Sequence, residues 1–102
     1  MTLRERRCLF TLNLAKLINF IISEGFEVNI AAAQDSPCPN CGFFSHKRTG
    51  KHPDGLAVDL NLYKNGMYLR NTNQHKQFGL YWESLGGVWG GNFNDGNHYE
   101  AK

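Results

Sequence analysis

The sequence predicts a single α+β domain, with a small antiparallel sheet and two helices packed on one of its faces. Three observations predict this class. An apolar stripe at helical spacing lies near the N-terminus, and a second helical pattern follows residue 70. Between them lies an alternating apolar segment followed by an Asn-Gly turn, as in a hairpin. A chain of 102 residues builds one core, which predicts one domain over residues 1–102.

The first helix is predicted over residues 9–22. One stripe carries its apolar side chains, which are Phe10, Leu14, Leu17, Ile18 and Ile21. A signal peptide is the alternative, because three arginines precede this stretch and three alanines follow it. Asn13 and Lys16 interrupt the apolar run, and two acidic residues lie before the alanines, so a core helix explains the pattern better.

Gly25 ends this helix, and residues 26–30 read as a short strand. Residues 31–51 show no sustained period and contain Pro37 and Pro39, which predicts a long loop. Loops of this length in a compact domain usually serve function. We therefore expect this segment to form a wall or lid of a site.

Residues 56–62 form the clearest predicted strand. Four aliphatic residues at period two face the core, and they are Leu56, Val58, Leu60 and Leu62. Asp59 therefore faces the opposite side. Residues 64–66 read as a hairpin turn, and residues 67–70 read as the partner strand.

The second helix is predicted from the N-cap candidates at 71–73 through Leu85, with Gly86 and Gly87 as its stop. Beyond it, residues 88–89 read as a strand, residues 90–91 as a bulge or a close approach, residues 92–97 as a turn and residues 98–100 as a final strand. His75, among polar neighbours at the start of this helix, reads as a solvated residue.

Charge and cysteine content exclude two classes of protein. Eleven Lys and Arg residues against nine Asp and Glu residues give a net charge of +2, which is too weak to indicate nucleic-acid binding. Three cysteines are too few for a disulfide scaffold. Cys38 and Cys41 form an isolated CxxC pair, which leaves free thiols, a short disulfide, or a structural zinc site with Cys8 and His46 as alternatives.

Histidine and aspartate side chains at two places predict a metal site. A catalytic zinc ion takes three protein ligands and leaves one position for water. Three residues satisfy that count, namely His52, Asp59 and His98. Gly55 lets the chain turn between the first two, so their side chains can converge. Asp95, three residues before His98 in a turn-rich segment, suits a general base.

These residues also carry a resemblance. Residues 51–60, with His52, Gly55, Ala57 and Asp59, resemble the H-x-x-G-x-A-x-D element of the zinc D-Ala-D-Ala carboxypeptidase and L-alanyl-D-glutamate endopeptidase family. Residues 95–100 resemble its closing D-x-x-H-[FY] element. The resemblance is dense from residue 52 to residue 100 and includes small phage-encoded members of the family. It implies a fold shared with hedgehog-type domains, with zinc on the three ligands above and Asp95 as the base.

The chain departs from the family pattern at two places. Gly50 stands where the family usually has Ser or Thr, two residues before the first zinc histidine. Residues 34–36, Gln-Asp-Ser, stand where the family tends to carry an arginine that contacts the substrate carboxylate or the oxyanion. Arg48 or Lys47 is our candidate replacement, and Trp89 is a candidate wall of the substrate cleft.

The resemblance implies a zinc peptidase that cuts peptidoglycan stem peptides, most simply an L-alanyl-D-glutamate endopeptidase of the phage endolysin kind. A D-Ala-D-Ala carboxypeptidase or dipeptidase, or an inactive zinc-bearing wall-binding module, are the alternatives. We expect Zn²⁺ as cofactor, a peptidoglycan peptide as partner, no nucleic acid or membrane partner, and a monomer. Without an evident signal peptide, the expected location is the host cytoplasm before lysis, with action on the cell wall.

Overall fold

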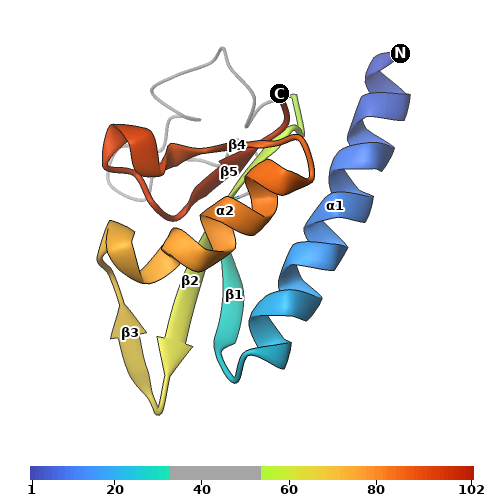
Figure 1. Ribbon diagram of the computed structural model, residues 1–102. Helices are drawn as coiled ribbons and strands as arrows, with labels where there is room; N and C mark the ends of the chain where they lie inside the picture. Colours follow the sequence, from blue (N-terminus) through green and yellow to red (C-terminus); the bar gives the residue numbers. More distant parts are fainter. Residues whose placement is uncertain (33–53) are drawn as a thin grey trace, which may run out of the picture.

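A computed structural model describes residues 1–32 and 54–102 of the chain, and every structural statement below concerns these residues. Their helices are α1 (Leu3–Ser23) and α2 (Lys76–Ser84), and short 3₁₀ turns lie at Thr72–His75 and Gly90–Phe93. The strands are β1 (Glu27–Ala32), β2 (Ala57–Lys64), β3 (Met67–Leu69), β4 (Val88–Trp89) and β5 (His98–Glu100). Figure 1 shows these elements, and the predicted α+β class is confirmed.

The strands form one antiparallel sheet in the order β1-β2-β5-β4, and β3 also pairs with β2. Strand β2 is long enough to serve two partners on one edge. Its first residues, 57–59, pair with β5, and its last residues, 62–64, pair with β3. Asn65 and Gly66 connect β2 to β3 with positive φ angles of 54° and 78°, as the Asn-Gly signal predicts.

Helix α1 begins earlier than the apolar stripe indicates. Thr2 and Glu5 form a capping box, in which the Thr2 hydroxyl accepts from the Glu5 N–H and the Glu5 carboxylate accepts from the Thr2 N–H. The predicted start at residue 9 is therefore wrong, because the cap satisfies the first backbone donors and lets the helix extend through the arginines. Burial within this helix is concentrated at Phe10, Leu17 and Ile21.

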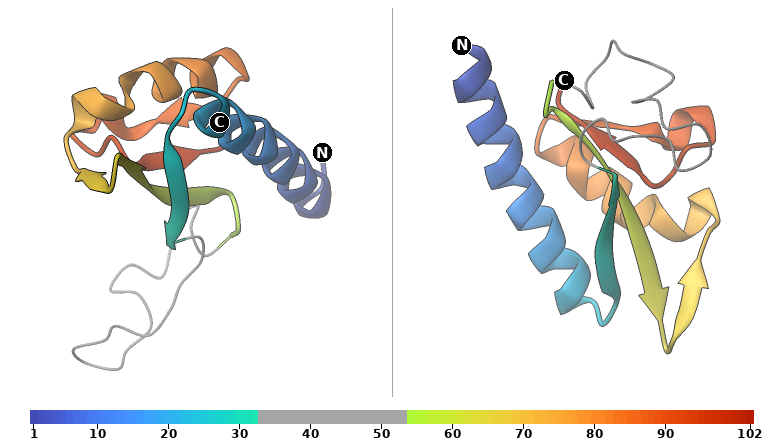
Figure 2. Two further views of the ribbon diagram at one scale, coloured as in Figure 1. Left: turned by 90° about the horizontal axis from the view of Figure 1, so that it is seen from below. Right: turned by 180° about the vertical axis from the view of Figure 1, so that it is seen from behind.

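Both helices cover the same face of the sheet, as the left view in Figure 2 shows. The core lies between them and the aliphatic face of β2, where Val58, Leu60 and Leu62 are all 0% exposed. Phe10 of α1 meets Trp82 of α2 edge to face, with ring centroids 5.6 Å apart. The predicted alternation of β2 is confirmed, and Asp59 lies on the face away from this core.

Two details of the second half correct the sequence prediction. The second helix starts as a 3₁₀ turn, and His75 within it is 2% exposed instead of solvated. Its Nδ1 lies 2.9 Å from the hydroxyl of Tyr99, a core residue, so the imidazole points into the core. Its polar neighbours Gln74 and Lys76 are exposed. Residues 90–93 form a second 3₁₀ turn instead of a bulge. The close approach predicted as the alternative is confirmed at Gly90, where a Cβ atom would lie 2.3 Å from the Asp95 carbonyl oxygen.

Candidate functional site

The pairing of β2 with β5 places Asp59 directly opposite His98. The Oδ1 atom of Asp59 lies 3.1 Å from Nδ1 of His98, although 39 residues separate them in sequence. The side chains lie on the face of the sheet away from the helices, and they are 27% and 17% exposed respectively. The contact is therefore partly shielded from water.

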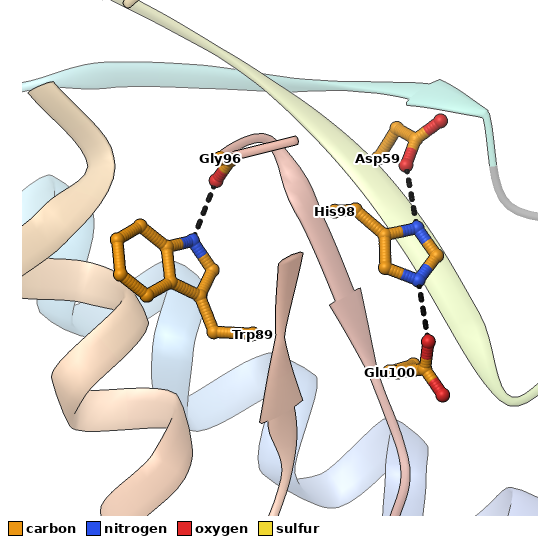
Figure 3. Close-up of polar contacts among 5 residues, drawn as sticks. All are labelled: Asp59, Trp89, Gly96, His98 and Glu100. Atoms are coloured by element: carbon orange, nitrogen blue, oxygen red, sulfur yellow. Dashed lines mark hydrogen bonds and ion pairs between the residues drawn. The ribbon is translucent and has the colours of Figure 1, made fainter. Parts of the chain in front are cut away.

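The other ring nitrogen of His98 contacts a second carboxylate. Nε2 lies 2.8 Å from Oε1 of Glu100, which is two residues further along β5 and so on the same face. Figure 3 shows the imidazole between the two carboxylates, one from β2 and one from its own strand. The ring is held from both sides in one orientation.

The electrostatics of His98 follow from these contacts. The hydrogen bond with Asp59 is the largest influence and raises the pKa of His98 above its ordinary value. Burial acts in the opposite direction, and Glu100 adds to the rise. In the metal-free protein the two carboxylates therefore favour the protonated imidazole, and a cation bound between Asp59 and His98 would replace that proton.

A tight turn carries Asp95 to the start of β5. The backbone N–H of His98 donates to the Asp95 carbonyl at 3.1 Å, and the Asp95 N–H donates to the Gly90 carbonyl at 3.0 Å. A Cβ atom on Gly90 would lie 2.3 Å from the Asp95 carbonyl oxygen, so this close approach needs glycine. The Asp95 side chain is exposed. The turn thus fixes the Asp95 backbone beside His98 and leaves Asp95 an exposed residue.

Trp89 supports this turn from behind. It is 6% exposed, and its indole N–H donates to the Gly96 carbonyl at 2.7 Å, as drawn in Figure 3. The ring is enclosed by Gly79 and Gly91, because a Cβ atom on either would lie within 2.1–2.3 Å of it. The Gly96 N–H in turn donates to the Thr72 hydroxyl at 3.2 Å. The substrate contact of Trp89 stays a prediction, and the described contacts of its side chain are with the Asp95 turn and its glycine neighbours.

The spacing between Asp59 and His98 fits two ligands of one zinc ion. Zinc binds nitrogen and oxygen at ~2.0–2.2 Å, so two ligand atoms at a tetrahedral angle lie about 3.3 Å apart. The observed 3.1 Å is close to that value. The other predicted ligand, His52, lies outside the described residues, as does Arg48. Within residues 1–32 and 54–102, no group of three His, Cys, Asp or Glu side chains is arranged as a metal site.

A protein-family model described as D-alanyl-D-alanine carboxypeptidase matches residues 45–101. The chain belongs to the D-alanyl-D-alanine carboxypeptidase family. The match spans more than half of the chain and includes both the 52–59 and the 95–98 elements. A search of curated proteins finds no match. Membership supports a peptidase related to peptidoglycan, and members of this family are generally zinc-dependent.

Two side chains near the site are given no role in it by the sequence prediction. Glu100 is one, and its signal is the period of two within β5 that puts it on the face of His98. Thr72 is the other, and no local pattern connects it to Gly96, 24 residues away.

Among the described residues, no helix is both long and apolar enough to cross a membrane.

Proposed function

We propose that this family member is a zinc peptidase that hydrolyses peptidoglycan stem peptides, with His52, Asp59 and His98 as the zinc ligands. The observation that carries the proposal is the register pair Asp59 and His98, whose ligand atoms lie 3.1 Å apart within the region that matches the family. Zinc in such sites activates water as a nucleophile near neutral pH and polarises the carbonyl that is attacked. The catalytic domain extends over residues 1–102 in this proposal.

Asp95 acts as the general base. Its backbone is held one turn from His98 by the bond between the Asp95 carbonyl and the His98 N–H, and its carboxylate is exposed to water. The carboxylate takes a proton from the attacking water and returns it to the leaving amine. We expect Asp95→Asn to retain zinc while kcat falls by about 100-fold or more, because positioned acid–base groups contribute on this scale.

Isothermal titration with zinc and steady-state hydrolysis of a stem peptide measure these two properties separately. Gln77→Glu is the control, since it changes an exposed position on α2 by one unit of charge. Full turnover by a zinc-loaded Asp95→Asn variant would place the base elsewhere.

Substrate contacts are proposed at Arg48, with Lys47 as the alternative, and at Trp89. Residues 34–36 contain no cation that could pair with the carboxylate of the substrate. The positive charge of Arg48 or Lys47 would take that role. Alanine substitution of both Lys47 and Arg48 is expected to lower kcat/KM. A change of less than twofold would remove this assignment.

For the bond that is cut, we propose that between L-alanine and D-glutamate, as in phage endolysins. The enzyme acts as a monomer, accumulates in the host cytoplasm and reaches the wall at lysis. A D-Ala-D-Ala carboxypeptidase is the second candidate, because the matching family model carries that description.

Mass spectrometry of fragments released from purified peptidoglycan tests this choice. New N-terminal D-glutamate supports the endopeptidase, and loss of terminal D-alanine supports the carboxypeptidase. Tight wall binding without any released fragment would instead indicate an inactive binding module and overturn the enzymatic proposal.

A further inference from the structure

Glu100 stands out because its carboxylate contacts an imidazole that the proposed function uses as a zinc ligand. The contact is short, with Oε1 of Glu100 at 2.8 Å from Nε2 of His98, and both side chains are partly buried. Nδ1 of the same ring faces Asp59 at 3.1 Å. The two nitrogens of His98 are therefore directed at two different groups, and Nδ1 points toward Asp59, the other proposed ligand among the described residues.

The backbone of Glu100 is fixed from several directions. It is paired with Ala57 of β2 on one side and with Val88 of β4 on the other. From the core side, the indole N–H of Trp82 donates to the Glu100 carbonyl at 2.8 Å. The backbone that carries the Glu100 side chain is thus anchored within the sheet.

A neutral imidazole carries one proton and offers one lone pair, so the partner of one nitrogen decides what the other can bind. A carboxylate at Nε2 holds the proton there and leaves the Nδ1 lone pair directed toward Asp59. It also increases the basicity of the ring, and outer carboxylates of this kind typically contribute 10–100-fold, roughly, to metal affinity.

We propose that Glu100 is a positioning residue for zinc: it accepts the Nε2–H of His98, so that Nδ1 serves as the ligand atom beside Asp59. This proposal rests on the proposed function, because it needs His98 to bind the metal. Glu100 itself does not contact the ion or the substrate in this arrangement. Its role is to fix the tautomer and the ring orientation of His98.

The test is the affinity of the purified protein for Zn²⁺, measured by competition with a chromophoric chelator. We expect Glu100→Ala to weaken zinc binding by about 10–100-fold. Glu100→Gln should lie closer to the original protein, because the amide oxygen still accepts from Nε2–H. Glu83→Ala is the matched control, since it removes the same charge from an exposed position on α2. It should leave zinc affinity unchanged.

A spectroscopic measurement shows which nitrogen binds. In the zinc-loaded protein labelled with ¹⁵N histidine, His98 should show a protonated Nε2 and a metal-coordinated Nδ1. Coordination through Nε2 would overturn the proposal. So would a Glu100→Ala variant within twofold of the original affinity, or Ala and Gln variants that lose affinity equally.

Failure of this proposal differs from failure of the proposed function. If the original protein binds zinc tightly and Glu100→Ala binds it equally well, the zinc peptidase stands and the role of Glu100 falls. If the original protein binds no zinc, both fall. Circular dichroism of each variant establishes that a lost affinity does not come from unfolding, and Glu100→Gln keeps the test open should the alanine variant fail to fold.

Discussion

At the scale of single residues, the sequence is most informative where a side chain has few ordinary uses. Asp59 interrupts an aliphatic strand, and His98 follows a turn rich in glycine and asparagine, so both are predictable as candidate ligands. Glu100 is less evident, because a glutamate is usually a solvated surface residue. Its contact with His98 depends on β5 being an extended strand, in which residues two apart lie on the same face.

His75 is predicted from the sequence to be solvated but is buried in the structure. Its burial leads to a prediction about the pH dependence of stability. Burial lowers the pKa of His75 to about 4, whereas the unfolded chain has the ordinary value near ~6.5. Below that value the unfolded state takes up a proton that the folded state does not, so stability falls as the pH drops from 6.5 toward 4. Between pH 7 and pH 4.5 this one group costs about 2 kcal/mol.

Urea denaturation of zinc-free His75→Gln at these two pH values checks this prediction. Glutamine cannot be protonated, so the decrease in unfolding free energy should be smaller than in the original chain by that amount. His98 changes the unfolding free energy with the opposite sign, because its raised pKa stabilises the fold at low pH. Since His98 is present in both proteins, its effect cancels in the comparison. An equal decrease in both would show that His75 is protonated in the folded state.

At the scale of elements, regular patterns are predictable and their ends are less so. The alternation of β2 and the stripe of α1 appear directly in the sequence, because each buries one face. The start of α1 depends on the reciprocal bonds of Thr2 and Glu5, which precede the apolar stripe. The turn at 90–93 depends on the approach of Gly90 to Asp95. The glycine pair predicts a close approach but does not specify Asp95 as its partner.

Trp89 connects β4 to the turn that carries Asp95, and its indole N–H is the link. Trp89→Phe keeps an aromatic ring but leaves the Gly96 carbonyl without this donor, which should cost about 1–3 kcal/mol of unfolding free energy. We expect the effect to be greatest in the turn itself. Amide hydrogen exchange at His98, whose N–H bonds to the Asp95 carbonyl, should accelerate more than exchange at Leu17 in α1.

A matched control is Phe78→Leu, which removes aromatic area from the same core without touching the turn. That variant should accelerate exchange at both amides to a similar degree. If Trp89→Phe also affected both equally, the indole would be acting through the core alone and not through its bond to Gly96.

At the scale of the whole molecule, the class of fold is predictable but the order of the strands is not. Two amphipathic helices and an antiparallel hairpin already require a layered α+β arrangement. The placement of β5 between β2 and β4 brings together residues that lie far apart in the chain, and no local pattern encodes that register. The same pairing creates the contact between Asp59 and His98, so the proposed centre is a property of the tertiary fold.

This dependence leads to a prediction about the stability of the whole domain. An ion held by Asp59 and His98 joins β2 to β5 and binds only the folded chain. Zinc at 100 times its Kd would then stabilise the fold by about 2.7 kcal/mol. For a domain of this size, each kcal/mol raises Tm by roughly 4–8 °C. Removal of zinc with a chelator should therefore lower Tm by about 10 °C or more, and added zinc should restore it.

Differential scanning calorimetry measures this shift, and His98→Gln provides the control. Glutamine preserves much of the volume but removes the imidazole, so the melting temperature of the variant should no longer respond to zinc. A shift that persisted in His98→Gln would mean that zinc acts at another place, such as the cysteines of residues 38–41. An original protein whose Tm ignores both chelator and zinc would contradict metal binding in the fold, because an ion bound only by the native state must stabilise that state.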